Sequence, residues 1–276
     1  MTIRLGGIIA GLAITAVLVL WSLLPGAYNY AFGPAPEQQP SYAFYEHGHG
    51  PEGGFAFDGA FGKWDVAQLQ RGYQVYKEVC KACHSLKYVA FRDLQQLGYT
   101  EAEVQAEAAT WTIPFKDPTT GEMAEAPGKP TDYFPPVYYA GQGVPPDLSL
   151  ITKARHDGSN YVYDLMMGYG EPDPAKAAKV GFEVPDGLYF NKHFPNVNIA
   201  MPAPLSDGQV TYADGAPNTT KDMAKDVAAF LTWTAEPKLI ERRQTGWFVL
   251  GFLLFATALA FLSYKQIWAG LKPKKK

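Results

Sequence analysis

Two long uncharged stretches lie near the ends of this 276-residue chain, and each predicts a helix able to cross a membrane. The C-terminal stretch runs from Gln244 to Tyr264. About 20 residues rising about 1.5 Å each span the ~30 Å hydrocarbon layer of a bilayer. Trp247 and Trp268 lie near its ends, where interfacial aromatic side chains are common. We therefore predict a transmembrane helix over residues 244–268.

The N-terminal uncharged stretch, Leu5 to Leu24, follows Arg4 and permits two interpretations. Residues 1–32 are either a signal peptide or an N-terminal anchor, and both export the region that follows. Residues 269–276 form a lysine-rich tail, which should stay in the cytoplasm because positive flanks are retained there. We expect the chain in the cell (inner) membrane, with a single C-terminal anchor and its central region on the periplasmic side.

Between these stretches, apolar residues recur at spacings of three and four and predict a mainly α fold. Helices are expected from about Asp65 to Cys80, from about Gly158 to Met167 and from about Lys221 to Glu236. Thr219 and Asp222 have the spacing of a capping box before the last of these helices.

Long Gly- and Pro-rich stretches separate the predicted helices. Residues 33–62 are interpreted as an irregular arm and residues 63–240 as one domain. His47 and His49 in the arm can bind metals, but two histidines alone rarely do, so a solvated loop is favoured. A compact domain with such long loops has a small hydrophobic core of its own, and a large prosthetic group can supply the missing part of that core.

The charge distribution favours a basic partner. The stretch from Glu37 to Arg243 holds all 27 acidic residues but 18 of the 24 basic ones, and so carries −9. This charge excludes nucleic acid and suits a basic protein. Glu171 and Asp173, in the sequence GEPDP, are candidate docking acids.

The two cysteines carry the strongest chemical signal, because residues 80–84 read CKACH. C-x-x-C-H is the attachment signature of haem c. Cysteines three apart at a helix end reach the two vinyl groups of one haem, and the adjacent histidine lies under the iron. A redox dithiol would accompany a βαβ pattern, and zinc would need two further ligands. We therefore predict one covalent haem c at Cys80 and Cys83, with its iron held by His84.

The sixth iron ligand must come from elsewhere, and methionine raises the potential of such haems. Met201 lies in NIAMPAPL, a proline-rich segment whose rigidity suits a ligand. Met166 and Met167 fall in a predicted helix and are expected to pack in the core. Met201 is the best choice on these grounds, and His193 is the alternative.

From about Phe55 to its C-terminus, the chain resembles the cytochrome c1 family of the cytochrome bc1 complex. The matching stretches occur in the family's order: RGYQVYKEVCKACHSLKYVAFRDL, KPTDYFPP, VPPDLSLITKARH, YVYDLMMGY, GLYFNKHFPNVNIAMPAPL and DVAAFLTWTAEPKLIERRQTG. The resemblance implies thioether bonds at both cysteines and axial ligation by His84 and Met201. It also implies that Arg92 pairs with a haem propionate and that Pro146 lies close to the haem. The first fifty residues match no stretch of the family.

The resemblance implies a cytochrome c-like helical haem domain with long loops, plus the C-terminal transmembrane helix. A Rieske iron–sulfur protein would reduce the haem, and the haem would reduce a soluble or tethered cytochrome c. Cytochrome b would be the third core partner, in a dimeric complex of the respiratory or photosynthetic chain. The chain is then an electron carrier and no enzyme on its own, although it is a subunit of a quinol–cytochrome c oxidoreductase.

Two other functions are compatible with the haem motif. A haem enzyme such as a peroxidase needs an open iron position, which a methionine ligand would close. A membrane-anchored cytochrome that shuttles electrons to an oxidase outside a bc1 complex needs none of the bc1 partners.

Overall fold

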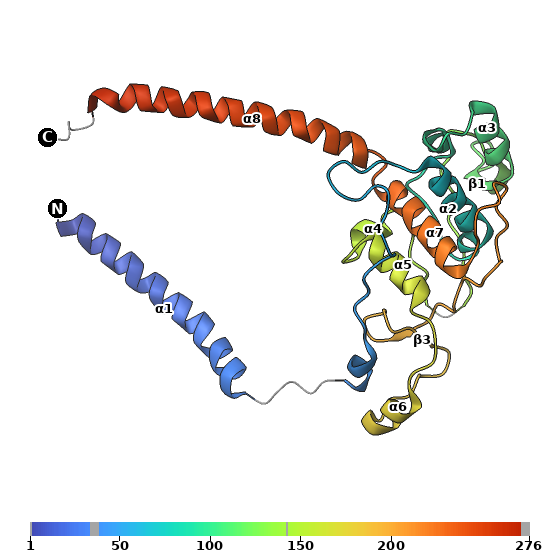
Figure 1. Cartoon of the computed structure of the whole chain (residues 1–276), viewed down its shortest axis with the longest axis horizontal. Helices are drawn as coiled ribbons and strands as arrows, with labels where there is room; N and C mark the ends of the chain where they lie inside the picture. The colour runs from blue at the N-terminus through green and yellow to red at the C-terminus, as the bar shows by residue number, and fades with distance from the viewer. Residues whose placement is uncertain (1, 34–38, 142, 272–276) are drawn as a thin grey trace. The chain divides into compact units, whose positions relative to one another are not determined.

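The computed structural model describes residues 2–33, 39–141 and 143–271, and the chain divides into two units, residues 1–40 and 41–276. The first unit consists mainly of one helix, α1, and all the later elements belong to the second (Figure 1). The α-helices are α1 (Thr2–Phe32), α2 (Val66–Glu78), α3 (Glu101–Ala109), α4 (Ile151–Ala154), α5 (Ser159–Met167), α6 (Pro174–Val180), α7 (Thr220–Ala235) and α8 (Leu239–Trp268). Short 3-10 helices are η1 (Pro40–Phe44), η2 (Cys80–Ala82), η3 (Phe91–Leu97) and η4 (Ala269–Leu271). The strands form two antiparallel pairs, β1 (Thr112–Lys116) with β2 (Met123–Pro127) and β3 (Tyr189–Phe190) with β4 (Asn198–Ile199).

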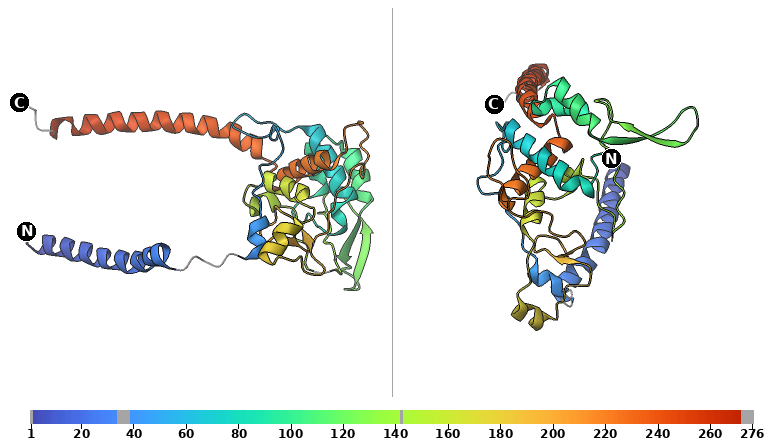
Figure 2. Two further views of the ribbon diagram at one scale, coloured as in Figure 1. Left: turned by 60° about the horizontal axis from the view of Figure 1, so that its bottom comes forward. Right: turned by 90° about the vertical axis from the view of Figure 1, so that its right-hand side faces the viewer.

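The core of the second unit is built where α2 crosses α7 (Figures 1 and 2). The crossing is closest at Gly72, where an added Cβ would lie 2.1 Å from the carbonyl oxygen of Asp226 and 2.7 Å from Cβ of Phe230. Only a residue without a side chain permits this approach. Arg71 fastens the crossing, because its Nε donates to the buried Asp226 carboxylate at 2.9 Å.

The sequence predictions for the three principal helices are confirmed. Asp65 caps α2 by accepting a hydrogen bond from the backbone N–H of Gln68 at 3.1 Å. Thr219 and Asp222 form the expected capping box at the start of α7. The fold is mainly α, with only short strands in the described residues, as the periodicity predicts.

Several smaller elements were not predicted. Helix α3 begins at its own capping box, formed by Thr100 and Glu103. The β1–β2 pair is a hairpin in which Thr112 faces Pro127 and Lys116 faces Met123. Its strands are almost entirely exposed, so the alternation of buried and exposed residues that marks a strand in a sequence is faint.

From residue 39 onward, the arm is irregular apart from η1, but it is packed against the domain. Phe55 and Phe57 are buried members of the main core. Phe44 belongs to a second cluster with Phe182 and Val197, and its ring lies 4.8 Å from that of Phe182. From Ser41 onward, the arm therefore forms part of the second unit.

Two helices, α1 and α8, are long and apolar enough to cross a membrane, and no residue of their most apolar windows is buried. The C-terminal helix begins at Leu239, five residues before the predicted start at 244. Its first turns lie against the domain, and the rest of it carries outward-facing apolar side chains. The predicted basic tail lies mostly outside the described residues, at 272–276.

Candidate haem site

The CKACH segment forms a tight turn directly after α2. The backbone N–H groups of Cys83 and His84 both donate to the carbonyl oxygen of Cys80, at 3.1 and 2.9 Å. The hydroxyl group of Tyr76, on the last turn of α2, donates to the carbonyl oxygen of His84 at 3.0 Å. The turn thus brings both thiols and the imidazole to one wall of a cavity.

A strap formed by residues 145–149 orients the imidazole of His84. The ring Nδ1 lies 2.7 Å from the carbonyl oxygen of Pro146, which can only accept, so Nδ1 carries the proton. Burial lowers the pKa of His84, and the ring is therefore neutral with a lone pair on Nε2. A neutral imidazole fixed through its other nitrogen is the usual form of a metal-ligating histidine.

Further hydrogen bonds hold the strap against the turn. Leu148 N–H donates to the carbonyl oxygen of Ser85 at 2.9 Å. The hydroxyl group of Ser85 and the backbone N–H of Lys87 both donate to the Asp147 carboxylate at 2.8 Å. These hydrogen bonds therefore fix the position of the Pro146 carbonyl group relative to the imidazole ring of His84.

The two cysteines have the properties of attachment sites rather than of a redox dithiol. They form no disulfide with each other. Burial raises the pKa of Cys80 to about 12, so its thiol stays protonated at neutral pH. Reactive dithiols instead depend on a lowered thiol pKa.

A second part of the cavity lining comes from the segment after β4. Met201 lies there half-buried, in irregular backbone next to Pro202. The hydroxyl group of Tyr169 donates to the carbonyl oxygen of Met201 at 3.0 Å and attaches this segment to the end of α5. Met166 also lines the cavity from α5, in addition to packing against the core as expected. The same expectation for Met167 is wrong, because Met167 lies on the outer side of α5 and is 37% exposed.

The cavity has a volume of about 540 Å³ and a mainly apolar lining. It falls in the size range of cofactor pockets. Its lining includes Cys80, Cys83 and His84 from the haem motif, Met201 from the proline-rich segment, and Pro146, which the resemblance places near the haem. Side chains of α7, among them Val227 and Leu231, also line it. Two thiols and a nitrogen donor on one side, with a thioether on the lining, fit a covalently attached haem.

Residues 55–271 match the Cytochrome C1 family. The chain belongs to the cytochrome c1 family. Its members are haem c proteins that carry electrons as a subunit of the bc1 complex, where they work with cytochrome b. The resemblance noted in the sequence is therefore confirmed, and so is the expected fold class.

Three relatives illustrate the breadth of the similarity. The chain is 44% identical over 243 residues to "Cytochrome b/c1" of Bradyrhizobium diazoefficiens, a match that covers 79% of this chain and 35% of that protein. The chain thus spans about a third of that longer relative. It is 43% identical over 240 residues to "Cytochrome c1 1, heme protein, mitochondrial" of Arabidopsis thaliana, covering 83% and 76% of the two chains. It is 40% identical over 236 residues to "Cytochrome c1" of Rhodospirillum rubrum, covering 79% and 87%.

Arg92, which the family resemblance pairs with a haem propionate, does not line this cavity. Its side chain is exposed, and it is not among the lining residues. Its backbone N–H donates to the carbonyl oxygen of Pro130 at 2.8 Å, which ties it to a different part of the domain. Among the lining residues in the described part of the chain, Arg155 is the one arginine or lysine. The sequence reasoning missed Arg155, although it stands beside His156 in a stretch that matches the family.

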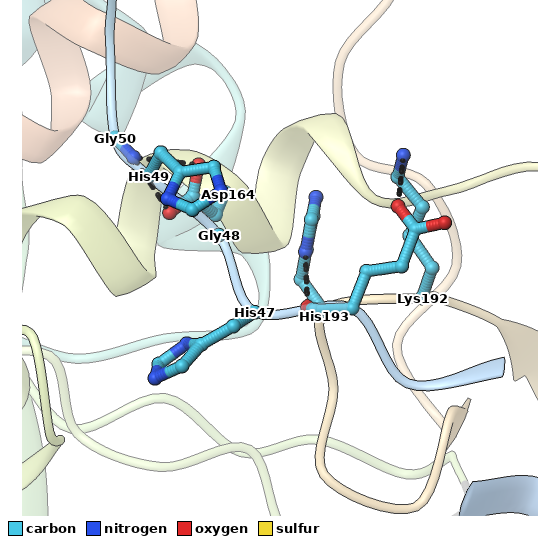
Figure 3. Close-up of a pocket in the computed structure, with 8 residues that line it drawn as sticks. His47, Gly48, His49, Gly50, Asp164, Lys192 and His193 are labelled. Carbon is cyan, nitrogen blue, oxygen red and sulfur yellow. Dashed lines mark hydrogen bonds and ion pairs between the residues drawn. The ribbon is translucent and has the colours of Figure 1, made fainter. Parts of the chain in front are cut away.

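His193, the alternative iron ligand, lies in a second, more open pocket (Figure 3). Its Nδ1 is 2.7 Å from the carbonyl oxygen of Glu46 in the arm. It does not line the cavity that contains His84. The structure therefore brings Met201, and not His193, to the cavity.

The arm histidines His47 and His49 line the same second pocket as His193. Figure 3 shows the ring of His47 pointing away from the other side chains. Its Nε2 lies 3.7 Å from the carboxylate of Asp157. Asp164 is engaged by the backbone, since both of its oxygens accept from Gly50 N–H. Within the described residues, no group of three or more potential ligands is placed to hold a metal ion.

Proposed function

We propose that this chain takes electrons from a Rieske iron–sulfur protein and passes them to a soluble or tethered cytochrome c. The relay would use one haem c joined covalently to Cys80 and Cys83, with His84 and Met201 as the axial ligands. A bound haem of this kind supplies a one-electron iron couple. The observation that carries the proposal is the single cavity lined by these four residues.

The chain's own residues would set the properties of this relay. The hydrogen bond from His84 Nδ1 to the Pro146 carbonyl oxygen fixes the orientation of the ring, and burial favours its neutral form. Both effects favour iron ligation through Nε2. The mainly apolar lining keeps water away from the centre and limits the reorganisation that accompanies a change of charge. A thioether from Met201 would favour the reduced state relative to a second nitrogen ligand.

Arg155 is our candidate for the residue that neutralises a haem propionate. A carboxylate at the edge of an apolar cavity needs a partner, and arginine can meet it with two parallel hydrogen bonds. Arg155 lines the cavity while remaining exposed to solvent, so it lies at the mouth. The same role for Arg92 stays a prediction from the family resemblance.

Extraction with acid and acetone tests the covalent haem. In the wild type the haem should remain on the unfolded polypeptide, because two thioether bonds hold it. Cys80→Ala should lose most holoprotein, whereas removal of the distant sulfur atom in Met123→Leu should leave the yield unchanged. Release of the haem from the wild type would contradict the proposal.

Purification of the membrane complex tests the partners. A reduced-minus-oxidised spectrum should show a b-type haem together with the c-type haem, at a fixed ratio per subunit. A c-type haem that purifies without any b-type haem would favour the alternative, a shuttle cytochrome serving an oxidase. Binding of carbon monoxide by the reduced protein would indicate an open iron position and favour a haem enzyme.

We also propose the topology that follows from the two ends of the chain. Residues 244–268 would span the membrane, with residues 269–276 in the cytoplasm and the haem domain, residues 63–240, on the periplasmic side with its arm, residues 33–62. Residues 1–32 would be a signal peptide or a second anchor. Protease added from the periplasmic side should cut the central region and spare the lysine-rich tail; cleavage of the tail would invert this topology.

A further inference from the structure

The arm contains a closed loop, residues 56–63, that presents one aromatic side chain to the outside. Lys63 N–H donates to the carbonyl oxygen of Ala56 at 3.0 Å and closes the loop. At Gly62 an added Cβ would lie 2.3 Å from the carbonyl group of Phe57, so the turn requires glycine. Within this ordered loop the side chain of Phe61 is 84% exposed.

This loop is attached to the first turns of α8. The guanidinium Nη1 of Arg243 donates to the carbonyl oxygens of Phe57 and, at 2.9 Å, of Gly59. The ring of Phe61 stacks on that of Trp247, with centroids 5.8 Å apart and planes inclined by 11°. Figures 1 and 2 show this loop beside the start of α8. The level of Phe61 along α8 is therefore the level of Trp247.

The position of Trp247 along α8 fixes its level relative to a bilayer. Trp247 and Trp268 are 21 residues apart, which corresponds to about 32 Å of helix. This length matches the ~30 Å hydrocarbon layer, and tryptophan is enriched at both of its boundaries. Trp247 then lies at the boundary nearer the haem domain, and Phe61 lies with it.

We infer that the loop formed by residues 56–63 is a second membrane contact, which inserts Phe61 among the lipids of the outer leaflet. The partner is the boundary between phospholipid headgroups and acyl chains. Phe61 and the half-exposed Trp247 extend the outward-facing apolar surface of α8, which includes the 81% exposed Phe248. Arg243 lies at the same level and uses only Nη1 for the loop carbonyls, which leaves N–H donors for lipid phosphate.

A second contact changes how the haem domain is held. One helix joined to a domain by a short segment leaves the domain free to rotate about the helix axis. The stacked side chains of Phe61 and Trp247, with Arg243 bonded to the loop backbone, would hold one side of the domain against the membrane. This inference depends on the proposed membrane span of α8, so its test includes a position that reports on the span alone.

The test uses a nitroxide label at Phe61→Cys in the full-length holoprotein in phospholipid nanodiscs. The thioethers occupy Cys80 and Cys83, so the new cysteine is the one site of labelling. Collision with oxygen, which concentrates in lipid, is compared with collision with a water-soluble nickel chelate. Met123→Cys, on the 71% exposed side chain of β2, is the aqueous control, and Phe255→Cys, in the middle of α8, is the lipid control.

The label at position 61 should collide with oxygen more than with the nickel chelate, at a ratio between those of positions 123 and 255. It should keep this ratio in the intact bc1 complex. A ratio equal to that of position 123, with position 255 in lipid, overturns the inference and leaves the span intact. A water-like value at position 255 overturns both. Protection from both reagents in the complex would show that a protein partner covers Phe61, and would also overturn the lipid contact.

Discussion

The hydroxyl group of Tyr169 donates a hydrogen bond to the backbone carbonyl oxygen of Met201 at 3.0 Å. Burial raises the pKa of Tyr169, so this donor keeps its proton throughout the physiological range. The bond joins the end of α5 to the segment proposed to carry the axial thioether. A neighbouring bridge between Tyr169 and Asn191 attaches the same region to β3.

Tyr169→Phe should loosen the Met201 segment without altering the covalent haem. Loss of the bond should cost about 1 kcal/mol in stability, a typical value for a single hydrogen bond. The absorption band of methionine ligation should then disappear at lower temperature than in the wild type. Tyr189→Phe, which alters an exposed tyrosine on β3, is the matched control and should leave the band unchanged. Equal melting of the band in both variants would deny Tyr169 this role.

Met201→His should lower the midpoint potential by roughly 0.1 V or more, within the ~0.8 V range spanned by axial ligands. The reason is that a second nitrogen ligand stabilises the oxidised iron relative to a thioether. Met166→Leu is the decisive companion, because Met166 lines the same cavity. It should preserve both the potential and the methionine band. An unchanged potential in Met201→His, together with a lost methionine band in Met166→Leu, would identify Met166 as the ligand.

Arg155→Ala should lower the midpoint potential, whereas Arg92→Ala should leave it close to the wild-type value. Removing a cation beside a propionate destabilises the reduced haem relative to the oxidised haem. Arg155 lines the cavity and Arg92 does not, so only the first change should act on the iron. Potentiometric titration of both holoproteins measures the difference. A fall in potential confined to Arg92→Ala would instead support the role that the family resemblance implies for Arg92.

Gly72→Ala should destabilise the holoprotein by about 1–3 kcal/mol, the usual cost of overpacking a core. The added methyl group would meet the backbone of Asp226 at a distance that the crossing of α2 and α7 does not permit. Denaturant unfolding of the full-length holoprotein, monitored by haem absorbance, measures this change in the free energy of unfolding. Gly170→Ala, where an added Cβ meets nothing within 4 Å, should have little effect. Similar stability of the two variants would contradict the described crossing.

Reduction of a basic cytochrome c should slow steeply between low salt and ~0.15 M, where the Debye length falls to about 8 Å. The central region carries the negative charge that would steer such a partner. Asp173 caps α6 by accepting from Ala175 N–H, so Glu171 is the better of the two acids to neutralise. Transfer from the tethered iron–sulfur protein should change far less. A flat profile for the acceptor reaction would indicate a tethered cytochrome instead.

The parts of the fold that could be predicted are those with local causes. The capping residues Asp65 and Thr219 act within one helical turn, and their helices begin where expected. The CKACH motif is local as well, and its turn depends on hydrogen bonds from Cys83 and His84 back to Cys80. The residues that make these interactions are close together in the sequence, so they can be recognised without knowledge of the tertiary structure.

The parts that could not be predicted depend on contacts between distant segments. Arg155 reaches the cavity because α4 and α5 pack on α7, and no pattern around Arg155 reports that packing. Arg92 follows the motif closely in sequence, but an isolated bridge between Ala90 and Tyr133 directs its segment elsewhere. The loop that carries Phe61 falls in a stretch rich in Gly, Pro and aromatic residues, from which the sequence predicts only an irregular arm.

The crossing of α2 with α7 also dictates an order of events during biogenesis. These helices occupy opposite ends of the domain's sequence, and bringing them together carries the loop-closure cost that slows folding. A chain that emerges from its N-terminus presents both cysteines well before α7 has arrived to bury them. Both thiols would therefore be accessible for the proposed haem attachment before α7, which lines the same cavity, completes the fold.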